Sequence, residues 1–389
     1  MGGAATEKKG KTKRQHYVPQ MILRNFSQNR ATTSVLVLSS GKRVPDAPIN
    51  RQAYEPYFYG EDQVMEESFA REEGKVASIL GDLSRDRLDA LCDTDIGALK
   101  MFIHYQHART LGAAQSMSNF AAAFAESALR GTAHLNNDDE LREALEHVKI
   151  SMTGAQHERL WLASKSTPII YDLEARFLVT ERAEGFLVGD HPVVAYNQFA
   201  EHHPLFSHYE ATTGIALKGL QLFMPLSPGV TLAFFDPSTY EYDGRRVCGV
   251  GPRDVRFLNA AQAVNSWECV FFDPSRTDDV ALERALAARR KHPSVFDKPV
   301  ATSDMIKRDD GAISQYVVVT HPDVRVGARF SFLRTTDKHS YAGYEGPTVP
   351  IRSQDLVRFT ELYGQHLEDE VKRGRMGRGL PVEEEQADA

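Results

Sequence analysis

The chain has 389 residues, of which 42% are hydrophobic and 25% are charged, and these values are typical of a soluble globular protein. The length allows one large or two ordinary domains with a substantial core. A formal net charge of −7 argues against a protein that coats nucleic acid through its bulk charge, although it leaves room for a local basic groove.

The first half of the chain is predicted to be rich in helices. Residues 1–14 form a basic arm, and their composition favours a solvated, disordered segment over a nucleic-acid-binding one. Apolar residues at helical spacing, and the N-cap chemistry of Asp93 and Asp95, predict the helices that follow. In chain order, we expect a strand at 34–44, an aromatic loop at 54–60, helices at 62–83 and 96–110, and two or three further helices between 116 and 175.

The second half is predicted to be mostly β. Two apolar runs flank the turn-like sequence ERAEG, which predicts a β-hairpin over residues 175–197. In chain order, we then expect a second hairpin at 219–237, a helix that leads into a strand at 269–272, a charged helix at 279–292, and late strands at 314–322 and 329–333.

Together these patterns predict an α+β fold, with a helix-rich N-terminal half followed by a mostly antiparallel sheet in a single large domain. The core is expected to span residues 15–275, and a C-terminal helix and strands over 276–370 are expected to pack on it. Residues 371–389 are charged and poor in apolar groups, so we expect a disordered tail there.

The segment HYVPQMILRNFS, residues 16–27, mixes strong hydrogen-bonding groups with bulky apolar ones. His16, Gln20, Arg24 and Asn25 stand among six large apolar side chains. A fraying terminus has no reason for such a mixture, so we expect this segment to belong to the body of the domain.

The helix predicted at 96–110 carries an apolar stripe that turns polar at its C-terminal end. Gln106 and Arg109 lie one turn apart on that face and need partners if they are buried. Arg109 could instead cap its own helix or pair with a carboxylate, and Glu67 and Glu73 are the two glutamates near the apolar register of the preceding helix. His104 and His107 lie three residues apart, which does not fit a zinc-binding pair.

The stretch GDHPV, residues 189–193, follows a buried apolar run. A carboxylate on a turn at the end of a strand is a common place for a catalytic group, which makes Asp190 a candidate, and an Asx-turn is the alternative. Further along, Asn259, Gln262 and Asn265 follow helical spacing and could share a face.

Several well-known motifs are missing, and their absence excludes classes of protein. The sequence lacks the signatures of P-loop NTPases, dinucleotide-binding oxidoreductases and α/β-hydrolases, and nothing in it indicates a cofactor. Cys92, Cys248 and Cys269 are far apart and lack metal-ligand spacing, so we expect reduced thiols, no zinc and a cytoplasmic protein. No apolar run approaches the roughly 18 residues that a membrane span needs, so no membrane partner is expected.

The order HYVPQ…LRNF, FYG with an acidic helix, QxxRT, GDHPV, PLSP and an Asn-bearing helix before a strand resembles the bacterial domain of unknown function numbered 4238, over residues 15–275. The resemblance brings no known reaction. Gly189 stands where members of that family more often have Ser, which removes a hydroxyl from the motif. The residues that match the family pattern are His16, Pro19, Gln20, Leu23, Arg24, Asn25, Phe26, Gln106, Arg109, Thr110, Asp190, Pro192, Pro225, Leu226, Pro228 and Asn259.

Three hypotheses stay open for these polar residues. In the first, the protein is a hydrolase or nuclease-like enzyme on a phosphate-bearing substrate, which would suit a role in bacterial defence. His16 would be the general acid or base, and Asp190 would orient it or activate water. Arg24 and Arg109 would hold the anion, because a planar guanidinium binds phosphate bidentately. The substrate would be positioned by Gln20, Asn25, Gln106 and Asn259.

In the second hypothesis, the same residues line a pocket that binds a nucleotide, a peptide or a carboxylate ligand without catalysis. In the third, the polar groups form a buried structural network without a ligand, because polar clusters can be structural as readily as functional. In the first two cases the partner is an anionic small molecule or a nucleic acid.

Overall fold

The structure is a computed structural model that describes residues 12–181, 184–208, 212–242, 245–292, 294–296, 300–307, 313–320, 322–335 and 348–377. Most of the predicted basic arm and of the predicted C-terminal tail therefore lies outside the described residues.

The N-terminal segment is a strand that turns into a short helix. Strand β1 (Arg14–His16) pairs with β4 (Tyr54–Pro56) in an antiparallel ladder. Helix α1 (Gln20–Asn25) starts directly after Pro19, whose φ of −57° suits a residue at a helix start. Ile22, Leu23 and Phe26 are buried in the largest hydrophobic cluster of the molecule, so the segment does belong to the body of the domain.

The two helices predicted around residues 62–83 and 96–110 are confirmed as α2 (Val64–Leu80) and α4 (Asp93–Ala108). Helix α4 begins earlier than expected, because the carboxylate of Asp95 lies inside its first turn and accepts the N–H of Cys92 at 3.0 Å. The other helical segments before the sheet are η1 (Ile49–Arg51), α3 (Arg85–Asp89), α5 (Leu111–Leu135), α6 (Asp139–His147), α7 (Ala155–Ser166) and η2 (Thr167–Ile170).

The larger sheet has five strands in the order β11-β5-β9-β8-β7. The hairpin predicted at 219–237 is confirmed as the antiparallel pair β8–β9, and only β11 and β5 pair in parallel. The strands are β5 (Glu174–Val179), β7 (Val194–Tyr196), β8 (Gln221–Ser227), β9 (Val230–Phe235) and β11 (Val247–Gly249), with α8 (Gln198–His202) after β7.

The hairpin predicted over 175–197 is wrong, because its two halves lie in different sheets. Strand β5 pairs with β9 and β11, whereas β6 (Val188–Gly189) pairs with β12 (Cys269–Phe272) in a four-stranded sheet of order β3-β2-β12-β6. Leu178 and Phe186 are both fully buried. Such continuous apolar runs show that a segment is buried, but they carry no information about its pairing partner. The remaining strands of this sheet are β2 (Thr32–Val37) and β3 (Arg43–Pro48).

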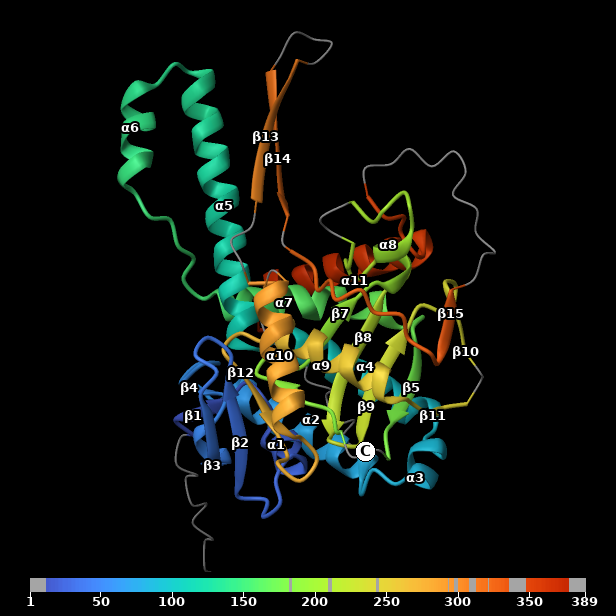
Figure 1. Cartoon of the computed structure of the whole chain (residues 1–389). Helices are drawn as coiled ribbons and strands as arrows, with labels where there is room; N and C mark the ends of the chain where they lie inside the picture. Colours follow the sequence, from blue (N-terminus) through green and yellow to red (C-terminus); the bar gives the residue numbers. More distant parts are fainter. Residues whose placement is uncertain are drawn as a thin grey trace, which may run out of the picture.

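Helix α9 (Pro252–Asn265) connects the two sheets (Figure 1). Its Leu258 packs with Phe223 of the five-stranded sheet, whereas its Ala263 packs with Leu36 and Val270 of the four-stranded sheet. Helix α10 (Asp279–Lys291) lies against α9 and confirms the helix predicted at 279–292. The helix and strand predicted up to residue 272 are likewise confirmed as α9 and β12.

The strand predicted at 329–333 is wrong except for its last residue, since β15 spans Leu333–Thr335 and pairs with β10 (Tyr240–Tyr242). The reason is that the main-chain N–H groups of this segment donate to side-chain oxygens rather than to the carbonyls of a neighbouring strand. The N–H of Phe330 donates to Gln198 Oε1 at 3.0 Å, and the N–H of Ser331 donates to Asp254 Oδ1 at 2.8 Å.

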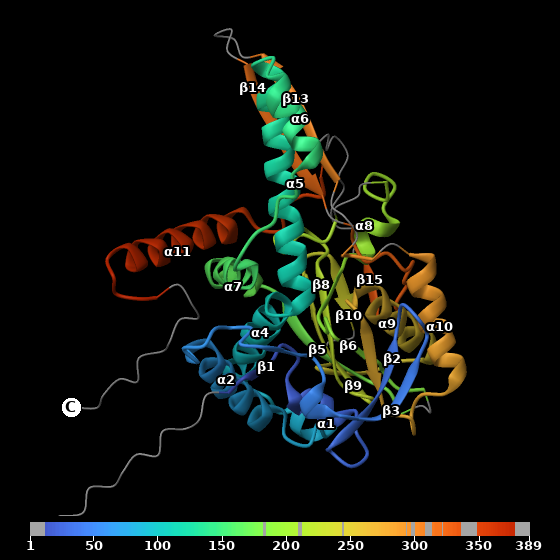
Figure 2. The same ribbon diagram turned by 90° about the vertical axis from the view of Figure 1, so that its left-hand side faces the viewer.

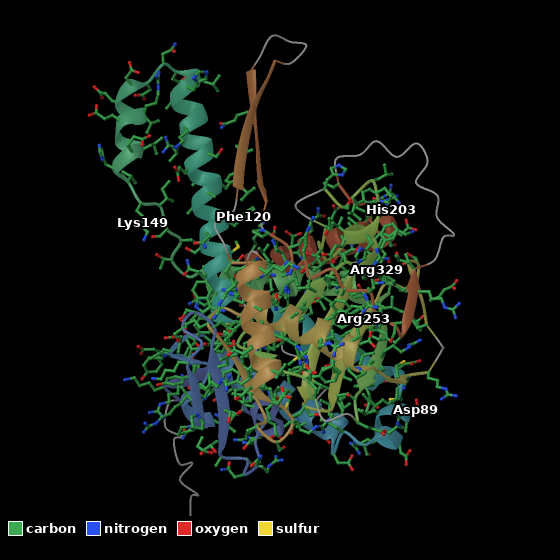
Figure 3. The ribbon with its side chains drawn as sticks, in the orientation of Figure 1. Asp89, Phe120, Lys149, His203, Arg253 and Arg329 are labelled. Atoms are coloured by element: carbon green, nitrogen blue, oxygen red, sulfur yellow. The ribbon has the colours of Figure 1, made fainter. Side chains whose placement is uncertain are left out.

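An arm projects from the body of the molecule (Figures 1 and 2). Helix α5 leaves the body beside the hairpin of β13 (Val300–Lys307) and β14 (Ile313–Thr320), and α6 folds back along its far end. The side-chain amide of Gln315 donates to the Ser127 carbonyl at 2.9 Å and ties hairpin to helix. Phe120, labelled in Figure 3, and Phe124 are exposed on α5.

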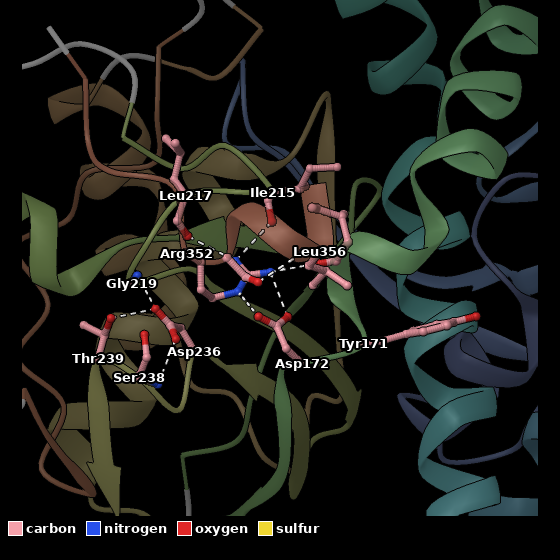
Figure 4. A network of polar contacts seen from close by, with 12 residues as sticks. Tyr171, Asp172, Ile215, Leu217, Gly219, Asp236, Ser238, Thr239, Arg352 and Leu356 are labelled. Carbon is pink, nitrogen blue, oxygen red and sulfur yellow. Dashed lines mark hydrogen bonds and ion pairs between the residues drawn. The ribbon is translucent and has the colours of Figure 1, made fainter. Parts of the chain in front are cut away.

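Helix α11 (Gln354–Lys372) is anchored to the core through the residue two positions before it (Figure 4). The Arg352 guanidinium, whose side chain is 2% exposed, pairs with Asp172 at 2.6 Å and donates to the carbonyls of Ile169, Ile215 and Leu217. A buried arginine with these acceptors fixes the C-terminal segment against η2 and the chain before β8. No helix within the described ranges is both long and apolar enough to cross a membrane.

Candidate functional site

His16 at the end of β1 forms one row with Gln20 and Arg24 of α1. The amide nitrogen of Gln20 lies 3.3 Å from each ring nitrogen of His16, and Arg24 Nη2 donates to Gln20 Oε1 at 3.0 Å. Burial lowers the pKa of His16; main-chain hydrogen bonds of Asn50 and Arg14 act in the opposite direction, and the charges of Arg14 and Arg24 lower it further. Within the described ranges no carboxylate pairs with Arg24, so the row contains a neutral imidazole and an uncompensated cation.

Asn25 points away from this row and ties α1 to the sheet. Its amide donates to the carbonyl of Leu226 at 2.9 Å, in the PLSP stretch of β8. The hydrogen bond joins the N-terminal segment to the PLSP stretch across about two hundred residues of sequence, which gives Asn25 a structural role.

Gln106 and Arg109 are buried, and Arg109 has a carboxylate partner. Arg109 Nη2 contacts Glu73 Oε1 at 2.6 Å, its Nε donates to Gln106 Oε1 at 2.7 Å, and its guanidinium lies 4.5 Å from the ring centre of Phe69. Gln106 in turn donates to the Tyr17 carbonyl at 2.9 Å. The alternative in which a glutamate of the preceding helix meets this arginine is therefore confirmed for Glu73.

Two parts of the predicted site do meet at their backbones. The Tyr59 hydroxyl donates to the Arg109 carbonyl at 3.1 Å and lies 3.5 Å from the His16 carbonyl. The α1 row and the end of α4 are thus neighbours, although the described contacts include none between the His16 ring and the Arg109 guanidinium.

Glu66 is a titratable group that the sequence did not single out. It lies two turns before Glu73 on α2, and burial together with the charge of Glu73 raises its pKa from 4.5 to about 7, while Arg109 acts in the opposite direction. A carboxyl group that is half protonated near neutral pH beside a buried ion pair is a candidate proton carrier.

Replacing Glu66 with Gln is expected to raise the free energy of unfolding at pH 8 by about 1 kcal/mol, and to leave it unchanged at pH 4.5. The folded pKa lies above the unfolded one, so stability is lost as the pH rises from about 4.5 to about 7, and a neutral amide avoids that loss. Urea denaturation at the two pH values measures the effect. The exposed neighbour Glu67→Gln is the control, and an equal gain from Glu67→Gln would contradict the assignment.

Asp190 is buried and its carboxylate is fully engaged by the main chain. It accepts N–H groups from Trp267 at 2.7 Å, Glu268 at 2.7 Å and Cys269 at 3.1 Å. Burial raises its pKa to about 6, against the opposing effect of the three donors. These hydrogen bonds to the Asp190 carboxylate fix the start of β12, 77 residues away in sequence. The described contacts of Asp190 include none to His16.

The side-chain amides of Asn259, Gln262 and Asn265 on α9 share a face, as their spacing predicted, and each one bonds to main-chain groups. Asn259 accepts the N–H of Leu187 at 2.8 Å and donates to the Gly185 carbonyl at 3.0 Å, so it holds the chain that leads to β6. Gln262 and Asn265 continue the same pattern along GDHPV, with Gln262 bonded to Gly189 and Pro192 and Asn265 to His191 and Val193.

A second polar cluster joins two family motifs with residues that the prediction did not include. Thr110 of QxxRT bonds through its hydroxyl to Nδ1 of His191 of GDHPV at 2.5 Å. The His191 ring lies 5.3 Å from that of His107, and Nδ1 of His107 lies 3.4 Å from Nη2 of Arg159 on α7. Partial signals for this cluster were present in the sequence, since the spacing of His104 and His107 was noted and His191 is adjacent to the predicted Asp190.

Within the residues that the structure describes, no group of three or more His, Cys, Asp or Glu side chains could hold a metal ion. Cys92, Cys248 and Cys269 are free thiols.

No curated protein and no solved structure matches this chain. Residues 14–276, well over half of the chain, match the family model described as Protein of unknown function (DUF4238), and the chain belongs to that family.

Proposed function

We propose that this protein is a hydrolase that acts on a phosphate-bearing substrate, a nucleotide or a nucleic acid strand, at the row of His16, Gln20 and Arg24. The observation that carries the proposal is the guanidinium of Arg24, which has an amide partner but no carboxylate among the described residues and stands beside a partly buried imidazole. A guanidinium in this state can bind a phosphate oxygen with its remaining N–H groups.

His16 suits the role of general base. A pKa below 6.5 keeps its ring neutral at pH 7, so it can take a proton from a water molecule that attacks phosphorus, while the ester oxygen leaves with the electron pair of the broken P–O bond. Gln20 is the positioning residue, because its oxygen holds Arg24 and its nitrogen faces the His16 ring.

Arg109 and Asp190 have no catalytic part in this proposal, because the guanidinium is neutralised by Glu73 and the carboxylate is engaged by three main-chain N–H groups. Asn25 and Gln106 support the fold around the row through their bonds to main-chain carbonyls, and Asn259 holds the chain that leads to β6.

Replacing His16 with Asn is expected to lower the hydrolysis rate by about 10²–10⁴-fold, the usual contribution of a general base. Arg24→Lys, which loses the planar fork but keeps the charge, is expected to raise KM more than it lowers kcat. Turnover of p-nitrophenyl phosphate, bis-p-nitrophenyl phosphate and a single-stranded oligonucleotide measures both effects.

Arg43→Gln is the matched control, because Arg43 is an arginine already paired with Asp279 and Glu283 on the surface. Wild-type protein that binds inorganic phosphate through Arg24 but turns over none of the three substrates would favour the non-catalytic binding module instead.

A further inference from the structure

Arg159 on α7 is a partly buried cation without a counter-ion among the described residues. Its Nη2 donates to Nδ1 of His107 at 3.4 Å, a long hydrogen bond to a neutral acceptor. Burial lowers the pKa of its guanidinium, and no acidic group opposes that effect. Leaving a charge in such a place costs stability unless a group of opposite sign offsets it.

Both histidines beside Arg159 are bonded through Nδ1, and neither Nε2 has a hydrogen-bond partner among the described residues. The Thr110 hydroxyl oxygen accepts the N–H of Ala113 at 3.1 Å, and its proton is available for Nδ1 of His191; when that proton is donated, the His191 proton lies on Nε2. Nδ1 of His107 accepts from Arg159, which likewise places the His107 proton on Nε2.

Neither ring carries a charge near neutral pH. Burial, and then the charge of Arg159, lowers the pKa of His191 to about 3 and that of His107 well below 6.5. The cluster therefore offers one permanent cation and two neutral N–H donors, and it contains no carboxylate acceptor.

Aromatic rings close one side of the cluster. The ring of Phe296 meets that of His191 edge-on at 5.3 Å, and Trp267 meets Phe296 at 5.2 Å. Phe296 approaches so closely that a Cβ on Gly112 would lie 2.5 Å from its ring, so any larger residue there would have to displace the ring. Apolar walls strengthen a charge–charge interaction, because they exclude water from it. His191 is only 4% exposed, which suits a small ligand rather than a polymer.

We infer that Arg159, His107 and His191 form an anion-binding site, separate from the row at His16, that takes the phosphate group of a small molecule. A tetrahedral oxyanion presents several acceptor oxygens to N–H donors, and Arg159 supplies the positive charge that it requires. The inference does not depend on catalysis at His16, because the two clusters share no side chain.

The test is titration of the whole protein with inorganic phosphate, followed by histidine side-chain ¹⁵N NMR, with His107 and His191 assigned from their Gln variants. Phosphate is expected to shift both resonances in wild type and in Arg24→Gln. In Arg159→Gln the apparent Kd at these two signals is expected to rise at least tenfold. Arg130→Gln is the matched control, because it removes the same charge from an exposed arginine that pairs with Glu126 and Glu146.

Thermal unfolding provides a second readout. In the absence of phosphate, Arg159→Gln is expected to be as stable as wild type or more so, because it removes an uncompensated charge. Its stabilisation by phosphate is expected to fall below that of the Arg130→Gln control. The inference is overturned if millimolar phosphate leaves both histidine signals unchanged in wild type, or shifts them equally in Arg159→Gln. Loss of hydrolysis alone would bear only on His16 and Arg24.

Discussion

Replacing Arg109 with Met is expected to lower the free energy of unfolding at pH 8 by about 3–5 kcal/mol. The change removes the ion-pair partner of Glu73 and leaves an unpaired, half-buried carboxylate on the same helix as Glu66. It also removes the hydrogen bond that Gln106 Oε1 accepts from Arg109 Nε. Methionine fills a similar volume over the Phe69 ring, so the loss reflects the charge rather than a cavity.

Urea denaturation of the single and double variants separates this effect from packing. Arg109→Met combined with Glu73→Gln is expected to recover part of the loss, because no unpaired carboxylate remains at position 73. Arg130→Gln, which breaks an exposed ion pair with Glu126, is expected to leave the stability nearly unchanged, because solvent screens the pair. A loss of less than 1 kcal/mol in Arg109→Met would contradict a structural role for this pair.

The sequence allowed the Arg109–Glu73 ion pair to be considered, because both residues follow helical periodicity. Glu73 lies in the register of Phe69 and Val76, and Gln106 and Arg109 stand one turn apart at the end of an apolar stripe. Local spacing thus identified two polar faces that had to be buried. The choice between Glu67 and Glu73 needed the packing of α2 on α4, which leaves Glu67 exposed.

Contacts between segments that are distant in sequence could not be predicted from local patterns. Periodicity reports which face of an element is buried, but not which element covers it. Arg159 and His107 are 52 residues apart, and nothing in either helix marks the other as its neighbour. The strand predicted at 329–333 failed similarly, because its N–H groups find acceptors on Gln198 and Asp254 rather than on a second strand.

The GDHPV motif shows the limit most clearly. The sequence placed a polar turn after a buried apolar run and made Asp190 either a catalytic candidate or the acceptor of an Asx-turn. It could not show that the acceptors of that carboxylate would be taken by the main chain of residues 267–269, or that the adjacent His191 would face Thr110. The GDHPV motif therefore indicated where polar side chains gather, but the separate roles of Asp190 and His191 could be assigned only from the structure.

Replacing Asp190 with Ala is expected to lower the free energy of unfolding by about 3–5 kcal/mol, because it leaves three N–H groups without an acceptor in a buried place. Asp190→Asn keeps a single acceptor oxygen. If that oxygen takes the Oδ2 position it serves Glu268 and Cys269, but the amide nitrogen then faces the N–H of Trp267. The Asn variant is therefore expected to fall between wild type and Ala in urea denaturation.

The pH dependence of the Asn variant distinguishes a buried ionisable group from a simple acceptor. The folded pKa of Asp190, about 6, lies above its usual value of 3.8, so wild type loses stability as the pH rises between these values, whereas Asn does not titrate. The advantage of wild type over Asp190→Asn is expected to be larger at pH 4 than at pH 8, by up to about 3 kcal/mol. Glu66 titrates equally in both proteins and cancels from the difference. An advantage that grows with rising pH would mean that the three N–H donors outweigh burial, and that Asp190 is held as a stable anion.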